Sequence, residues 1–157
     1  MDKRALFTGN SFKLTAPREK VFLDNLVTQG YPFFAGSIKL SEKFNLKGLS
    51  KDKTGAELVF DRPDSIVTRV YINGAEVKTF LWAPYRADIT EFVREGENEI
   101  TIELINSCRN LLGPHHHSDG ELYAVGQHSY RDTSSWTDDY CFVRFGVSGL
   151  DININFI

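Results

Sequence analysis

Three consecutive histidines, His115 to His117, are followed within a few residues by Asp119 and Glu121. Such side chains could ligate a metal, move protons or hydrogen-bond a partner. A zinc site needs three or four ligands that converge on one ion, whereas consecutive residues of an extended chain point alternately to opposite sides. At most two of the three histidines then reach one ion, and Asp119, Glu121 and His128 complete a set only through loop folding. Polar contact with a ligand or with another domain is the favoured interpretation, and a loop whose histidines bind local backbone groups is the alternative.

A second group lies in the stretch SSWTDDY, where Trp136 and Tyr140 flank Asp138 and Asp139. A sugar site commonly combines an aromatic ring, which covers the apolar C–H face, with carboxylates that orient the hydroxyls. The alternative is structural, with Trp136 covering the core and the two aspartates capping a turn. Glycosidase chemistry by Asp138, Asp139 and Glu121 is disfavoured, because neighbouring residues rarely place two carboxyl groups about 5 to 9.5 Å apart across one glycosidic bond.

A third group is Trp82 with Tyr85 and Arg86, which could stack on a sugar or pack beneath a neighbouring loop. The cluster of Tyr31, Phe33 and Phe34 around Pro32 raises a similar choice between core filling and an exposed interface. Aromatic residues make up 13% of the chain, which suits both a β core and ring stacking.

The elements that must position these groups are mostly strands. Apolar residues alternate with period two in many short segments, which is the pattern of a sheet with one buried face. These segments lie at 38–46, 58–60, 66–72, 77–82, 100–104, 143–147 and 152–156. The dipeptide Asn73-Gly74 predicts a tight hairpin turn, since both central residues of a type I′ turn need positive φ. We count about eight strands and two short helical turns.

Two segments are predicted to be helical. Asp88 can begin a short turn, with Glu91 three residues later completing a capping box and Gly96 ending it. Residues 18–30 pair Phe22 with Leu26 and Leu23 with Val27 at a spacing of four, which favours a helix. The stretch from 106 to 140 has no sustained period, and its length marks it as a functional or interface loop.

Composition narrows the class of protein. A chain of 157 residues suits one domain, and a net charge of −3 argues against a nucleic-acid partner. No apolar run approaches the roughly 20 residues of a membrane span, and the first ten residues lack the apolar stretch of a signal peptide. We therefore expect a soluble chain of undefined compartment. Cys108 and Cys141 are interpreted as two thiols, with a disulfide as the alternative. Short antiparallel strands with so little helix predict an all-β sandwich, either immunoglobulin-like or a jelly roll.

The segment VYINGAEVKTFLWAPYRADITEFVREGENEITIEL resembles the sugar-binding jelly-roll domain of family 2 glycoside hydrolases, which has a galactose-binding-like fold. In that family a strand ends in Asn-Gly, an aromatic residue and Asp-Ile-Thr follow, and Gly-Glu-Asn precedes the next strand. The matching positions here are Asn73, Gly74, Tyr85, Asp88, Ile89, Thr90, Gly96, Glu97 and Asn98. QGYPFFAGSIKLSEKF, RNLLGPHHH and WTDDYCFVRFGV resemble accessory modules of large bacterial α-L-rhamnosidase-type enzymes, so the similarity covers most of residues 29 to 150.

The resemblance implies one galactose-binding-like domain over residues 1–157, with 1–28 as a lead-in segment, as a fragment of a larger bacterial glycosidase. The family's catalytic carboxylates lie in a separate barrel domain, so no catalytic role carries over and we predict a chain that is not itself an enzyme. Members of this fold often hold a structural calcium ion, so calcium is a candidate here, with no ligands that the sequence names and no cofactor predicted with certainty. The predicted function is accessory carbohydrate binding; the alternative is a structural module that docks on a catalytic domain. The predicted sugar-binding residues are Trp82, Arg109, His115, His116, His117, Trp136, Asp138, Asp139 and Tyr140.

Overall fold

The computed structural model describes residues 5–50, 54–131 and 133–156, without the side chains of residues 154–156. The chain divides into two compact units. The first, called the loop unit here, comprises Met1–Gly36 and Ser107–Gly146, and the second, the sandwich unit, comprises Ser37–Asn106 and Val147–Ile157. The organisation as one domain remains a prediction. The predicted lead-in over residues 1–28 belongs to the loop unit, and its first four residues lie outside the described part.

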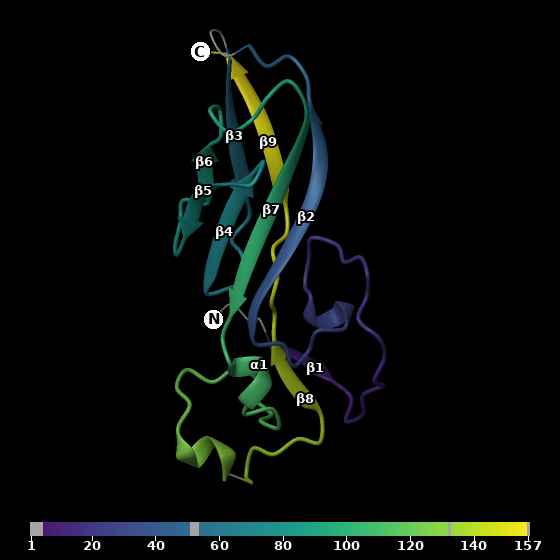
Figure 1. Cartoon of the computed structure of the whole chain (residues 1–157). Coiled ribbons are helices and arrows are strands. Elements are labelled where there is room, and N and C mark those ends of the chain that lie inside the picture. Colours follow the sequence, from purple (N-terminus) through teal and green to yellow (C-terminus); the bar gives the residue numbers. More distant parts are fainter. Residues whose placement is uncertain (1–4, 51–53, 132, 157) are drawn as a thin grey trace. The chain divides into compact units, whose positions relative to one another are not determined.

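The fold is all-β, as the sequence predicts (Figure 1). The strands of the sandwich unit are β2 (Gly36–Leu46), β3 (Thr54–Phe60), β4 (Val67–Ile72), β5 (Ala75–Phe80), β6 (Arg86–Asp88), β7 (Gly96–Asn106) and β9 (Leu150–Phe156). The elements of the loop unit are β1 (Ala5–Thr8), the 3₁₀ turn η1 (Val27–Gln29), helix α1 (Arg109–Leu112), the 3₁₀ turn η2 (Gln127–Tyr130) and β8 (Tyr140–Val143). No helix in the described part of the chain has the length and apolar character that crossing a membrane requires.

The sandwich unit contains two sheets, one ordered β2-β7-β4-β5 and the other β6-β3-β9. Period-two alternation buries one face of each: alternate residues of β3 and β4 are buried, as predicted from the sequence. The rings of Phe60 and Phe80, from the two sheets, meet edge to face with centroids 4.9 Å apart. Each fully buried aliphatic or aromatic side chain of such a core contributes roughly 1.5 to 3 kcal/mol. The sandwich is therefore a conventional hydrophobic scaffold.

The Asn73-Gly74 turn joins β4 to β5, with φ of 50° and 83° at its two residues, which confirms the predicted hairpin. Asn73 also donates from Nδ2 to Oδ1 of Asn98 at 2.9 Å. Asn98 is 1% exposed, and its amide group further bonds the backbone of Arg94 and Gly96. The Asn-Gly and Gly-Glu-Asn motifs are thus two halves of one buried hydrogen-bond network, and their role in this chain is to fix the turn before β7.

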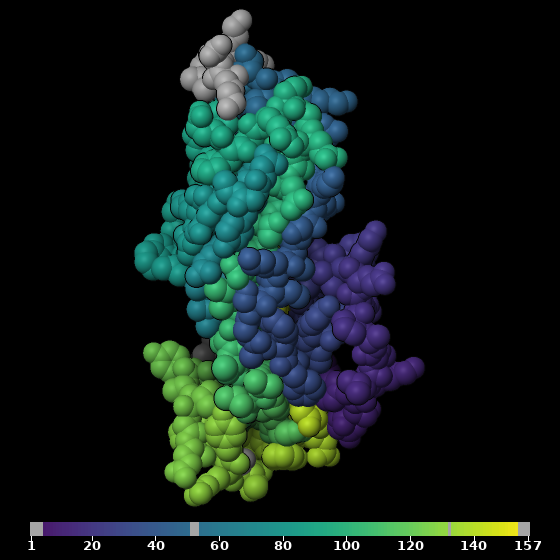
Figure 2. All heavy atoms as spheres, in the orientation of Figure 1, coloured from purple at the N-terminus to yellow at the C-terminus, as the bar shows by residue number. Residues whose placement is uncertain are grey.

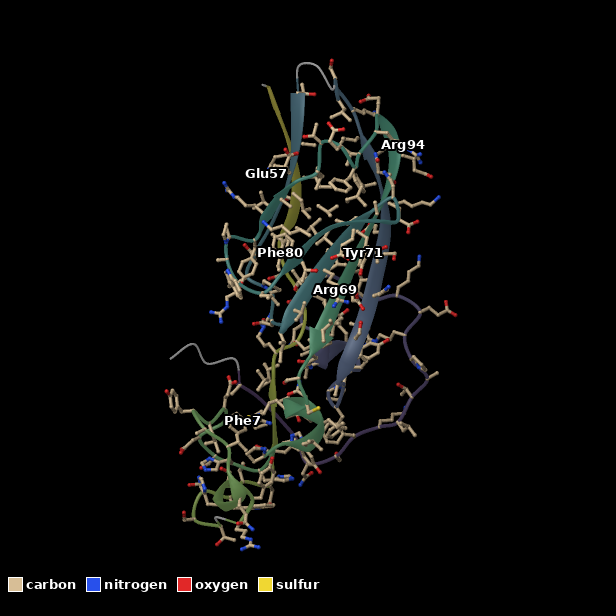
Figure 3. The ribbon with its side chains drawn as sticks, turned by 60° about the vertical axis from the view of Figure 1, so that its left-hand side comes forward. Phe7, Glu57, Arg69, Tyr71, Phe80 and Arg94 are labelled. Carbon is tan, nitrogen blue, oxygen red and sulfur yellow. The ribbon has the colours of Figure 1, made fainter. Side chains whose placement is uncertain are left out.

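The outer face of the four-stranded sheet carries one buried carboxylate. Glu103 is 8% exposed and accepts hydrogen bonds from the Ser37 hydroxyl at 2.6 Å and the Tyr71 hydroxyl at 3.1 Å. Arg69 pairs with the same carboxylate at 3.4 Å, and both Arg69 and Tyr71 project from β4 (Figure 3). These donors, led by Ser37, hold the pKa of Glu103 below its usual range. The network ties β2, β7 and β4 together.

The predicted helix over residues 18–30 is wrong. Only Val27–Gln29 forms a 3₁₀ turn, and Asn25 instead makes a β-bridge to Gly146. The Leu26 amide donates to the Phe145 carbonyl at 2.7 Å. Backbone groups that a helix would have hydrogen-bonded locally are bonded here to a segment about 120 residues away in the sequence. Helix propensity is a weak preference, and long-range pairing overrides it here.

The loop unit has an aromatic core. Phe142 and Phe145 are both fully buried, and Phe34 stacks on Phe145 with centroids 5.5 Å apart. Phe33 meets Phe142 edge to face at 4.9 Å but remains 36% exposed, so within the predicted aromatic cluster Phe34 packs against the core and Phe33 lies at its edge. Two strands, β1 and β8, pair antiparallel in this unit. The predicted strand over 143–147 is displaced, since β8 ends at Val143. Cys108 is exposed and Cys141 is buried, whereas the sequence favoured two half-buried thiols, and the structure has both cysteines as free thiols.

Candidate functional site

The histidine run lies in the loop unit, where residues 107–146 form a continuous block of surface, green to yellow in Figure 2. Its backbone pairs with the stretch 135–141 like a short ladder. The Cys141 amide donates to the His115 carbonyl at 2.7 Å, and the Thr137 amide to the His116 carbonyl at 3.2 Å. A β-bridge joins His117 to Trp136. This pairing brings the two groups that the sequence singled out, the histidines and SSWTDDY, side by side.

The three histidines have three different environments. The ring of His115 packs against Phe142 at 5.1 Å, and its Nδ1 lies 3.3 Å from the Cys141 carbonyl oxygen. Burial lowers the pKa of His115, which favours the neutral imidazole. His116 stacks on Trp136 with centroids 4.5 Å apart and an interplanar angle of 20°. Nδ1 of His117 accepts a hydrogen bond from the Asp119 amide at 3.3 Å. The run therefore does not converge on one point.

A pocket with about 170 Å³ of free volume opens beside this ladder. The lining residues are Leu112, Pro114, His115, His116, Ser129, Tyr130 and Trp136. Tyr130 and Trp136 are 56% and 55% exposed, so two aromatic rings face solvent at its wall. The Tyr130 hydroxyl donates to the Gly113 carbonyl at 3.2 Å, which holds η2 against the segment that follows α1. The site thus combines exposed rings with imidazole and hydroxyl groups.

The predicted residues of SSWTDDY divide between the pocket and its surroundings. The Trp136 indole N–H donates to Asp138 Oδ1 at 3.1 Å, which orients the ring. Tyr140 contacts His116 edge to face at 4.3 Å and is half-buried. Asp139 is exposed, and its backbone amide bonds the Thr137 hydroxyl at 3.3 Å. The roles of these residues in sugar binding stay predictions.

Trp82 lies in the sandwich unit after β5 and is 73% exposed. Its neighbour Tyr85 packs against Phe60 with centroids 5.8 Å apart, which is a contact within the core of this unit. Arg86 lies 3.6 Å from a carboxylate oxygen of Glu57. Of this third group, only Trp82 presents a ring to solvent.

Arg109 is the first residue of α1, and its role in sugar binding stays a prediction. Its three guanidinium nitrogens are out of solvent contact and form no hydrogen bond of standard geometry with the described residues, although the arginine lies close enough to the Cys141 thiol to offset part of the rise in its pKa that burial causes. Sequence reasoning also missed Leu112, Pro114, Ser129 and Tyr130, which line the pocket. They stand in a stretch without periodicity, so only the proximity of Leu112 and Pro114 to the histidines could have suggested them.

Within the described ranges, no three His, Cys, Asp or Glu residues come together as a group that could hold a metal ion. The candidate structural calcium ion stays untested.

Comparison with known proteins points to glycosidases. No family model matches the chain. A curated protein of Formosa agariphila, named "Putative beta-glucuronidase", is 31% identical over 85 residues, which are 54% of this chain and 7% of that protein. The solved rhamnosidase from Novosphingobium sp. PP1Y covers 85% of this chain at 23% identity with a TM-score of 0.58. A Bifidobacterium dentium beta-glucuronidase structure, in complex with coumarin-3-O-glucuronide, covers 80% of the chain and 22% of its own, at 15% identity and a TM-score of 0.49.

The chain spans only 12% of the rhamnosidase and 7% of the curated relative. It is therefore similar to short parts of much larger glycosidases, and it has the all-β fold of the rhamnosidase part that it matches.

Proposed function

We propose that this chain is a non-catalytic accessory domain of a glycoside hydrolase, with a galactose-binding-like jelly-roll scaffold, and that it binds carbohydrate at the pocket of the loop unit. The observation that carries the proposal is the pocket wall itself, where the Trp136 ring is 55% exposed, stacks on His116 and is oriented by its hydrogen bond to Asp138. The similarity to short parts of large glycosidases supports it.

Binding at this site combines stacking with polar contacts. The apolar face of a pyranose packs on Trp136 or Tyr130, which removes water from one side of the sugar. Nδ1 of His116 lies 3.1 Å from the Thr137 carbonyl and so carries the proton, which leaves Nε2 to accept from a sugar hydroxyl. The Ser129 hydroxyl accepts from the Gly126 amide at 3.2 Å and can donate to the ligand. A pocket of about 170 Å³ suits a single ring rather than a long chain.

Affinity should be modest, because each net hydrogen bond contributes only about 0.5 to 1.5 kcal/mol against competing water. The test is a glycan-array screen of the 157-residue chain followed by calorimetric titration of any hit. Trp136→Ala and His116→Ala should each weaken binding by about tenfold or more. Tyr123→Ala is the matched control, since Tyr123 is a 96% exposed ring of the same unit outside the pocket lining. A folded wild type that binds no glycan would overturn the proposal.

A second candidate is docking on a catalytic domain without binding of free sugar. The observation that favours it is the set of large apolar side chains exposed on residues 111–136 of the loop unit: Leu111, Leu112, Tyr123, Val125, Tyr130 and Trp136. Exposed apolar surface of this kind marks an interaction site. Under this function, alanine substitutions at Leu111 and Leu112 weaken association with a glycosidase catalytic domain, and the glycan array stays empty.

A further inference from the structure

The pocket of the loop unit offers no permanently charged partner to a ligand. None of the seven described residues that line it is an aspartate, glutamate, lysine or arginine. The ring nitrogens of His115 are engaged with the backbone of Cys141 and Leu111, and burial lowers the pKa of this ring, so it is neutral at neutral pH. Arg109 lies close to His115 but is not part of the lining. A charged ligand group would lose its water here without gaining a direct partner, so the pocket favours a neutral group.

One wall of the pocket is aliphatic. Leu112 ends α1 and Pro114 follows it closely, and both side chains line the pocket. Leu112 is 65% exposed, so its side chain is open to a ligand. Water gains no hydrogen bond from such a side chain, whereas an apolar ligand group leaves water when it packs there. Burial of a single methyl group corresponds to about a fourfold gain in affinity. The wall therefore favours a ligand that carries a methyl group at this point.

The lining also offers one hydrogen-bond acceptor and one donor. Nδ1 of His116 donates to the Thr137 carbonyl at 3.1 Å, so Nε2 is the acceptor. The Ser129 hydroxyl is 7% exposed and accepts from the Gly126 amide at 3.2 Å, which leaves its proton for a ligand. The Tyr130 hydroxyl already donates to a backbone carbonyl. A hexose carries several hydroxyls, and burying them against so few partners is unfavourable. The pocket thus suits a compact group with one donor and one acceptor.

We propose that the ligand of the pocket is an N-acetylated sugar whose acetamido group enters it. The acetyl methyl packs on Leu112 and Pro114. The amide N–H donates to Nε2 of His116, and the amide oxygen accepts from the Ser129 hydroxyl. An acetamido group combines one methyl, one donor and one acceptor without charge, which is the set that the lining complements. The pyranose ring then stacks on Trp136. This inference rests on the proposed function and names its ligand class.

The first experiment compares sugars that differ only at C2. N-Acetylglucosamine and glucose, and N-acetylgalactosamine and galactose, are titrated calorimetrically into the 157-residue chain. The wild type should bind an N-acetylated sugar about tenfold more tightly than its hydroxyl counterpart. Burial of the methyl group accounts for about fourfold of this preference, and one further hydrogen bond accounts for the rest.

Leu112→Ala tests the aliphatic wall. It should lower the affinity for the N-acetylated sugar about threefold and change the affinity for glucose little, because only the methyl group loses its contact. The exposed position of Leu112 allows this change without loss of the fold. Leu111→Ala is the matched control, since Leu111 is the adjacent leucine, is 50% exposed and lies outside the pocket lining. Both affinities should stay unchanged in this variant.

The second experiment locates the acetyl group in the bound sugar. In saturation-transfer difference NMR, the acetyl methyl protons of N-acetylglucosamine should receive more saturation from the protein than any ring proton. Leu112→Ala should reduce the methyl signal relative to the ring signals, and Leu111→Ala should not. Stronger saturation of the ring protons than of the methyl protons would overturn the proposal, because the acetamido group would then point away from the wall.

The outcomes of the titrations separate the two levels of the argument. Equal affinity for N-acetylated and hydroxyl sugars would overturn the acetamido assignment and leave the proposed carbohydrate site standing. Binding of no sugar, in the titrations and on the glycan array, would overturn both. A preference for N-acetylated sugars that Leu112→Ala leaves at full size would also overturn the assignment, because the methyl group would then be bound elsewhere.

Discussion

Replacing Asn98 by alanine should destabilise the sandwich unit far more than its size suggests. Its side-chain oxygen accepts from the Arg94 amide and from Asn73 Nδ2, both at 2.9 Å, and its nitrogen donates to the carbonyls of Arg94 and Gly96 at 2.7 and 2.9 Å. The residue is 1% exposed, so water does not readily replace these four bonds. At about 0.5 to 1.5 kcal/mol for each net bond, with part recovered by local relaxation, we expect a loss of about 3 kcal/mol.

The loss is measured by urea unfolding followed by far-UV circular dichroism, with thermal melts alongside. For a chain of this length, about 3 kcal/mol corresponds to a fall in melting temperature of roughly 6 to 12 °C. Asn45→Ala, at an exposed position of β2, is the matched control and should change stability by less than about 0.5 kcal/mol. A loss below about 1 kcal/mol for Asn98→Ala would refute the reasoning, because the amide would then not hold the turn before β7.

Three further predictions follow from single side chains. The Ser37 hydroxyl and its neighbours lower the pKa of Glu103 from 4.5, so that carboxylate stabilises the fold above this pH, and its contribution disappears as the pH falls through the folded pKa. Between about pH 6 and pH 3, the free energy of unfolding in urea should therefore fall less steeply for Glu103→Gln than for the wild type. An equal slope for the two proteins would contradict this reasoning. Burial lowers the pKa of His115 from 6.5, so the fold should lose stability as the pH falls below about 6.5. In thermal melts at about pH 7.5 and pH 5.5, the melting temperature of His115→Gln should lack this pH-dependent fall. An unchanged pH dependence in the variant would count against the buried neutral ring. Gly146 has φ of 150°, and a Cβ at this position would overlap the backbone oxygen of Asp24. In the same melts, Gly146→Ala should therefore lower the free energy of unfolding by more than about 2 kcal/mol. A smaller loss would show that the Asn25–Gly146 bridge can shift.

The scaffold was more predictable than the site, for physical reasons. Asn73-Gly74 and the alternation in β3, β4 and β7 depend on local geometry and on burial of one face, and both can be inferred from neighbouring residues. The helix expected over residues 18–30 failed because Leu26 and Asn25 pair with Phe145 and Gly146, contacts that no local pattern encodes.

Contacts between distant parts of the chain also limited what the sequence could predict about the site. The histidines and Trp136 stood out by type, and the structure pairs them. Tyr130 and Ser129 did not stand out, since their place at the pocket depends on how an aperiodic loop folds back. The burial of the Arg109 guanidinium could not be inferred either, because it too depends on how this aperiodic stretch folds back around α1.

The pairing of β3 with β9 governs the order in which the protein can assemble during synthesis. Thr54 lies opposite Phe156 and Phe60 opposite Leu150, so the partners are about 90 to 100 residues apart. While the ribosome makes residues 107–146, the later part of the loop unit, β3 has β6 on one side and an open edge on the other. An open edge of this kind invites pairing with another chain. The nascent sandwich is therefore most exposed to aggregation while residues 107–146 are being translated, and emergence of β9 ends that interval.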